Sequence, residues 1–149
     1  MQMKLAYGRK GLDVDLPDYL DVIEPRFVPG LKNEKQAILE ALREPIGSAA
    51  LREVIRPGMS AVIVHTDITR ATPNDRILPV ILEVLEANGI NRDDITMLNG
   101  LGTHRFQTEG ELREMLGDQI VEDYFCLQHD CHDDDGLIHL GKTSFGHPV

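Results

Sequence analysis

Two apolar segments, each followed by a polar loop and an amphipathic helix, constrain the fold of this chain more than any other feature. Residues 59–65 contain Ala-Val-Ile-Val, which is apolar on both faces of a strand, and residues 95–98 form a second strand. A run of this kind is typical of a central parallel strand with helices on either side. The order strand, helix, strand, helix, strand predicts an α/β fold, with a Rossmann-like parallel sheet flanked by helices.

The helices are predicted from capping residues and apolar stripes. The first helix is expected over residues 33–43 with Asn33 as N-cap, and the second over residues 48–55, beginning at Ser48. The third begins at Pro73, with Thr72 as N-cap, and stops at Gly89. The fourth follows Thr108, which forms a capping box with Glu111, runs through Leu116 and stops at Gly117.

Shorter segments complete the expected fold. Residues 3–7 and 12–16 alternate in polarity around a turn and predict an N-terminal β-hairpin. Residues 21–31, rich in Pro and Gly, read as an extended surface segment, and residues 124–127 and 137–140 as further strands. We expect a single α/β domain over residues 1–149.

Composition narrows the function classes. The net charge of −10, with scattered basic residues, argues against binding to nucleic acid. No apolar run approaches the roughly 20 residues of a membrane helix. The two cysteines form no CxxC pair and no export signal is visible, so we expect a protein of the cytoplasm that does not bind membranes.

The first candidate site is the loop after residues 59–65. Arg70 offers a planar fork for a carboxylate or phosphate, and it stands beside a helix N-terminus, where free N–H groups favour anions. The alternative is that Thr72 only caps the helix and Asp67 only pairs with Arg70.

The second candidate is the loop after residues 95–98, which carries His104 behind two glycines. Histidine moves protons near neutral pH, although a hydrogen-bonded surface histidine is the plain alternative. Both loops leave the carboxyl ends of parallel strands, where such sheets bind ligands. We therefore expect Arg70 and His104 to face one cleft, shared with Asp67, Thr69 and Thr72.

The segment from His129 to Asp135 is rich in metal-ligand types, but three aspartates in a row are also ordinary turn residues. A solvated turn is favoured, and no metal ligand is assigned. The remaining histidines, His65, His139 and His147, are expected to be structural.

Taken in order, these motifs resemble the N-terminal domain of the lactate racemase family. The resemblance covers nearly the whole chain and rests on Tyr7-Gly8, Pro25-x-x-x-Pro29-Gly30, Ala41-Leu42-Arg43-x-Pro45-Ile46-Gly47, Leu51-Arg52, Asp67-Ile68-Thr69-Arg70-x-Thr72-Pro73, Gly102-Thr103-His104-Arg105, His129-Asp130 and Gly141-x-Thr143-Ser144-x-Gly146-x-Pro148-Val149.

The resemblance implies a racemase or epimerase of 2-hydroxyacids that uses a nickel-pincer nucleotide. In such an enzyme the substrate carbon gives hydride to the cofactor while a histidine takes the hydroxyl proton. Arg70 matches the residue that holds the substrate carboxylate, and His104 matches one of two histidine bases. We assign Asp67, Thr69 and Thr72 to cofactor binding.

The resemblance also implies a division of the active site. The family's second histidine base, its cofactor-bearing lysine and a nickel-binding histidine lie C-terminal to the matched region. We therefore expect this chain to be the N-terminal part of a longer enzyme and to need the C-terminal remainder as partner. Alone, it is expected to be inactive and to self-associate through its exposed edge. The alternative is a non-catalytic α/β anion-binding module.

Overall fold

A computed structural model describes residues 1–149, which divide into two compact units, Met1–Gly30 and Leu31–Val149. In the first unit, strand β1 (Gln2–Leu5) pairs antiparallel with β2 (Leu12–Asp15), so that Gln2 lies opposite Asp15 and Leu5 opposite Leu12. The turn between them contains two glycines with positive φ, Gly8 and Gly11. The predicted N-terminal hairpin is confirmed, whereas the prediction of a single domain over residues 1–149 stays a prediction.

The second unit contains a three-stranded parallel sheet in the order β3-β4-β5. The strands are β3 (Ala61–His65), β4 (Ile95–Asn99) and β5 (Phe125–Gln128). Their register places Val64 beside Leu98, and Leu98 beside Leu127. The α/β fold is confirmed, and so is the adjacency of the strands at residues 61–64 and 95–98 with their carboxyl ends at one edge.

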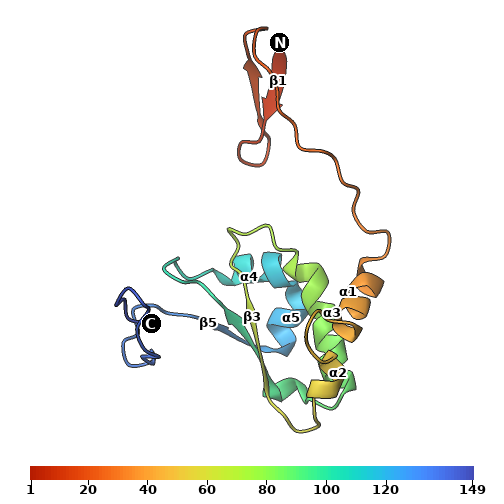
Figure 1. Cartoon of the computed structure of the whole chain (residues 1–149), viewed down its shortest axis with the longest axis vertical. Helices are drawn as coiled ribbons and strands as arrows, with labels where there is room; N and C mark the ends of the chain where they lie inside the picture. Colours follow the sequence, from red (N-terminus) through yellow and green to blue (C-terminus); the bar gives the residue numbers. More distant parts are fainter. The chain divides into compact units, whose positions relative to one another are not determined.

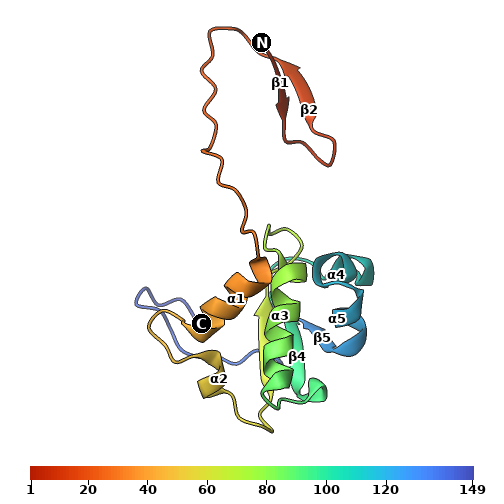
Figure 2. The same cartoon turned by 90° about the vertical axis from the view of Figure 1, so that its right-hand side faces the viewer.

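The helices of this unit lie on one side of the sheet (Figure 1), and Figure 2 shows them from that side. They are α1 (Glu34–Arg43), α2 (Leu51–Val54), α3 (Asn74–Ala87), α4 (Glu109–Leu116) and α5 (Asp118–Asp123), with a short 3₁₀ turn at Arg92–Asp94. The core forms where α3, α4 and α5 cover the sheet, and its most buried members include Leu82, Ile95, Met97, Leu116 and Ile120. None of these helices combines the length and the apolar character needed to cross a bilayer.

The prediction of a central strand at residues 59–65 is wrong in one respect. Strand β3 lies at an edge of the sheet, and its outward side chains Val62 and Val64 are 61% and 66% exposed. The physical reason is topological. Strands that are added in one direction by right-handed crossovers place all their connecting helices on the same face.

Three predicted details also need correction. The second helix begins at Leu51 with Ala50 as N-cap instead of at Ser48. Pro73, not Thr72, is the N-cap of α3, because the Asn74 N–H donates to the Thr72 carbonyl and leaves Thr72 outside the helix. Residues 137–140 form no strand, since the Leu140 N–H is bonded to the carbonyl of Val149 within the same tail.

Candidate functional site

The polar loops that follow β3 and β4 line one hollow of about 300 Å³ at the carboxyl edge of the sheet. Its wall is formed by Thr66, Asp67, Arg70, Gly100, Leu101, Gly102, Thr103 and His104. The two strand ends are joined where the Gly100 N–H donates to the His65 carbonyl at 2.9 Å. A Cβ at Gly100 would lie 3.3 Å from the Val64 side chain, so the close approach of the loops favours glycine there.

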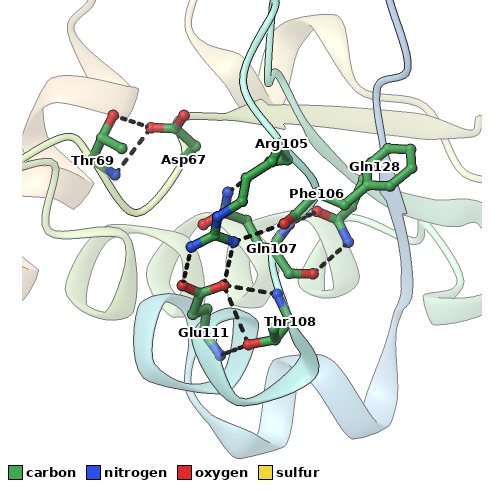
Figure 3. Close-up of polar contacts among 8 residues, drawn as sticks. All are labelled: Asp67, Thr69, Arg105, Phe106, Gln107, Thr108, Glu111 and Gln128. Carbon is green, nitrogen blue, oxygen red and sulfur yellow. Dashed lines mark hydrogen bonds and ion pairs between the residues drawn. The ribbon is translucent and has the colours of Figure 1, made fainter. Parts of the chain in front are cut away.

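Asp67 is the buried acid of this hollow, with 3% of its surface exposed. Its Oδ1 accepts hydrogen bonds from the Thr69 hydroxyl at 2.6 Å and from the Thr69 N–H at 3.1 Å (Figure 3), and its Oδ2 contacts Nδ1 of His104. The bond from the Thr69 hydroxyl, followed by the bond to His104, lowers the pKa of Asp67 to about 2 despite its burial. Asp67 is therefore a carboxylate at neutral pH.

His104 stands at the mouth of the hollow with its side chain 43% exposed. Its backbone is fixed by a bond from its N–H to the Leu101 carbonyl at 3.0 Å. An ionised carboxylate at Nδ1 favours the tautomer with the proton on Nδ1, which leaves Nε2 as a hydrogen-bond acceptor. The same histidine also borders a second hollow of about 460 Å³, which is otherwise lined by Thr103, Arg105, Phe106 and residues 129–132.

Arg70 lines the first hollow, and its guanidinium has no partner within the chain. Its backbone N–H donates to the Asp67 carbonyl at 3.1 Å, which makes a tight turn between the two residues. The alternative interpretation, in which Asp67 pairs with Arg70, is not met, because the Asp67 carboxylate is already bonded to Thr69 and His104. The arrangement leaves a free cation next to a hydrogen-bonded acid and histidine.

Only some of the five predicted residues line the hollow. Asp67, Arg70 and His104 line the hollow itself. Thr69 lies outside its wall but holds Asp67 in place, and Thr72 neither lines the hollow nor caps α3.

The loop that carries His104 is tied down by contacts that the sequence did not reveal. Arg105 forms a two-pronged ion pair with Glu111, at 2.7 and 2.9 Å, while Glu111 also accepts from the Thr108 N–H at 2.8 Å (Figure 3). Gln107 and Gln128 exchange two hydrogen bonds, at 2.7 and 3.0 Å. The only sequence feature that indicated this contact of Arg105 with Glu111 was the predicted capping box, which places Glu111 in the first turn of α4.

The segment from residue 129 to residue 135 forms turns. The Asp130 carboxylate accepts from the His132 N–H at 2.9 Å, and Asp133 accepts from the Gly136 N–H at 3.1 Å. No three His, Cys, Asp or Glu side chains of the chain gather in an arrangement that could hold a metal ion. Among the other histidines, His65 is buried at the end of β3, and this burial lowers its pKa.

Comparison with known proteins decides the family. Residues 7–149 match the family model described as the lactate racemase N-terminal domain. The chain belongs to this family. The lactate racemase of Lactiplantibacillus plantarum is 31% identical over 114 residues, which are 76% of this chain and 27% of that protein. The lactate racemase of Thermoanaerobacterium thermosaccharolyticum is 26% identical over 148 residues, which are 97% of this chain and 34% of that protein.

Solved structures support the lactate racemase fold. The lactate racemase apoprotein of T. thermosaccharolyticum superposes with a TM-score of 0.77 at 24% identity, over 99% of this chain and 34% of that one. A protein from Thermotoga maritima superposes with a TM-score of 0.60 at 23% identity, over 78% of this chain and 26% of that one. The chain therefore spans about a third or less of the length of these relatives.

Proposed function

We propose that this chain supplies the substrate-anchoring arginine and one proton-transferring histidine of a lactate or related 2-hydroxyacid racemase. The observation that supports this most strongly is the geometry of one hollow. It combines the unpaired guanidinium of Arg70 with a histidine, His104, that is oriented by a buried carboxylate. Membership of the lactate racemase family supplies the substrate class.

Arg70 binds the substrate carboxylate in this proposal. A guanidinium presents two parallel N–H groups that match the two oxygens of a carboxylate. Because Arg70 has no partner in the chain, its charge is available to the substrate without breaking an internal ion pair. Anchoring by the carboxylate holds the neighbouring hydroxyl group at a fixed distance from Arg70, on the side of the hollow that His104 borders.

His104 takes the hydroxyl proton through Nε2. The Asp67 carboxylate accepts the Nδ1 proton, keeps the ring in the required tautomer and stabilises the imidazolium that forms. The Thr69 hydroxyl holds this carboxylate in its orientation from the other oxygen. Inversion of the substrate carbon requires its hydrogen to leave as hydride and to return on the opposite face, while a base on each side exchanges the hydroxyl proton. We place the hydride acceptor and the second base in parts of the enzyme outside this chain.

The nickel-pincer nucleotide does not fit the residues present here by themselves. No three-ligand group is available to hold a metal ion, so the metal and the attachment of the cofactor belong to other segments of the enzyme. Cofactor binding by Asp67, Thr69 and Thr72 stays a prediction. The hydrogen bonds of Asp67 and Thr69 favour a role for these two in positioning His104.

The test uses a fusion in which this chain replaces the matching first third of the T. thermosaccharolyticum lactate racemase. Arg70→Lys keeps the charge but loses the fork, and we expect the KM for lactate to rise about tenfold or more, because a charged hydrogen bond contributes about 1.5–3 kcal/mol. His104→Ala should lower kcat by about 10²–10⁴-fold.

Arg52→Lys serves as the control and should leave both constants unchanged, because Arg52 lines a separate hollow between α1, α2 and α3. Wild-type kinetics in the Arg70 variant, or a loss of less than tenfold in the His104 variant, would contradict the proposal.

A further inference from the structure

The sheet has one face that no helix of this chain covers. It consists of the side chains that alternate away from the helices, which are Val62, Val64, Thr96, Leu98, Phe125 and Leu127. The register aligns them in two rows across the three strands, so they form one continuous surface, called here the open face. Its four outer apolar side chains are 43–66% exposed, which is unusual because parallel sheets are normally covered on both faces.

The chain topology explains why the face is open and indicates what would close it. The strands follow one another from β3 to β5 in a single direction, and the helices lie on the other face. Covering the open face with a right-handed crossover requires a strand added on the opposite side, at the free edge of β3. The helix that connects to such a strand would then cross the open face.

We propose that the open face and the free edge of β3 are the docking surface for a strand and amphipathic helix from the part of a lactate racemase that lies outside this chain. The lactate racemases that match it have about two thirds of their length beyond the matched region, so the family contains the polypeptide needed. A second copy of this chain fits less well, since it would offer its own bare sheet where a parallel sheet requires a helix.

Docking at this edge would also complete the candidate site. A strand parallel to β3 ends at the same edge of the sheet, next to the loop that carries Asp67 and Arg70. The free edge of β3 would then become the point at which the strand order reverses, and open α/β sheets bind ligands in the crevice at such a point. The missing residues of the hollow are therefore expected in the loop that follows the added strand.

The experiment measures how fast a thiol on the open face reacts with a maleimide. Val64→Cys is prepared in this chain alone and in the fusion with the remaining two thirds of the T. thermosaccharolyticum enzyme. Ile46→Cys is the matched control, because Ile46 is fully exposed and lies in the turn between α1 and α2 instead of on the sheet. Labelling at each position is followed by peptide mass spectrometry, with the natural Cys126 on the helix-covered face as internal reference.

We expect the thiol at position 64 to react at least about tenfold more slowly in the fusion than in the chain alone, since reaction then requires local opening. The rate at position 46 should not change. Adding Phe125→Glu on the opposite side of the open face should restore fast labelling in the fusion, while leaving the unfolding midpoint of the chain alone unchanged.

Equal labelling rates at position 64 in the two proteins would overturn the proposal, and so would a fusion whose two parts unfold independently. Protection in the chain alone that grows with protein concentration would assign the face to a second copy and would equally overturn it.

Discussion

At the residue scale, Asp67 holds the candidate site together, because its carboxylate bonds to both Thr69 and His104. The sequence indicated that Asp67, Arg70 and His104 lie at one sheet edge, because strand ends are local signals, but Thr69 and Thr72 lie outside the wall of the hollow. It did not reveal which of them bond to one another. Asp67 was expected beside Arg70 or a cofactor, whereas its partner His104 lies 37 positions away in the sequence. Such pairing is set by how the two loops meet in space.

The low pKa of Asp67 predicts a pH dependence of stability. The pKa falls from 3.8 to about 2 on folding, so the ionised group stabilises the fold above about pH 4 by about 2 kcal/mol, and this contribution is lost as the pH falls toward 2. Asp67→Asn should remove this part of the acid sensitivity and destabilise the protein at pH 6. Urea unfolding at pH 6 and pH 3 measures both effects.

Asp134→Asn, in an exposed turn, is the control for this comparison and should behave as the wild type. If Asp67→Asn retained the full difference between the two pH values, the Asp67 carboxylate would not be a source of this acid sensitivity.

At the element scale, the sequence predicts correctly the elements that depend on interactions between residues close in sequence, and fails where distant segments decide the structure. The hairpin and the capping box of α4 are specified by neighbours in sequence, and both are confirmed. The edge position of β3 and the missing strand at residues 137–140 depend on which other elements reach them, which local patterns do not encode. Helix α5 was not predicted, because its six residues directly follow Gly117, the expected stop.

The first turn of α4 has two roles: Thr108 caps the helix, and Glu111 anchors the His104 loop through Arg105. Substitutions at the two positions should separate these roles. Thr108→Ala removes the N-cap and should cost about 1 kcal/mol of unfolding free energy. Glu111→Gln keeps a capping side chain but loses the charge that pairs with Arg105. We expect it to change global stability little, since exposed ion pairs contribute little, and to speed hydrogen exchange of residues 101–107.

Hydrogen–deuterium exchange and urea unfolding of both variants test this separation. Exchange in the loop that is as slow in Glu111→Gln as in the wild type would show that the ion pair with Arg105 does not anchor the loop.

At the scale of the whole molecule, we propose that the chain contains one part of a divided active site. It corresponds to about a third or less of the length of its lactate racemase relatives. It provides one candidate base and no group able to hold a metal ion. We therefore predict that the chain alone does not convert D-lactate to L-lactate, even with the mature cofactor, because two-sided transfer needs groups fixed on both faces. A stereospecific assay for L-lactate checks this, and turnover above a control with cofactor alone would contradict it.

Binding of a 2-hydroxyacid carboxylate by Arg70, in the hollow between the β3 and β4 loops, is the step on which the proposed function rests, and it can be measured on this chain directly. Nuclear magnetic resonance of ¹⁵N-labelled protein during a titration with D-lactate follows the Arg70 side chain and the amides of residues 100–104. We predict saturable chemical-shift changes confined to these groups. The Kd should lie in the millimolar range, which corresponds to a binding free energy near −4 kcal/mol, and Arg70→Lys should bind at least tenfold more weakly. Shifts that map elsewhere, or equal binding by wild type and Arg70→Lys, would contradict it.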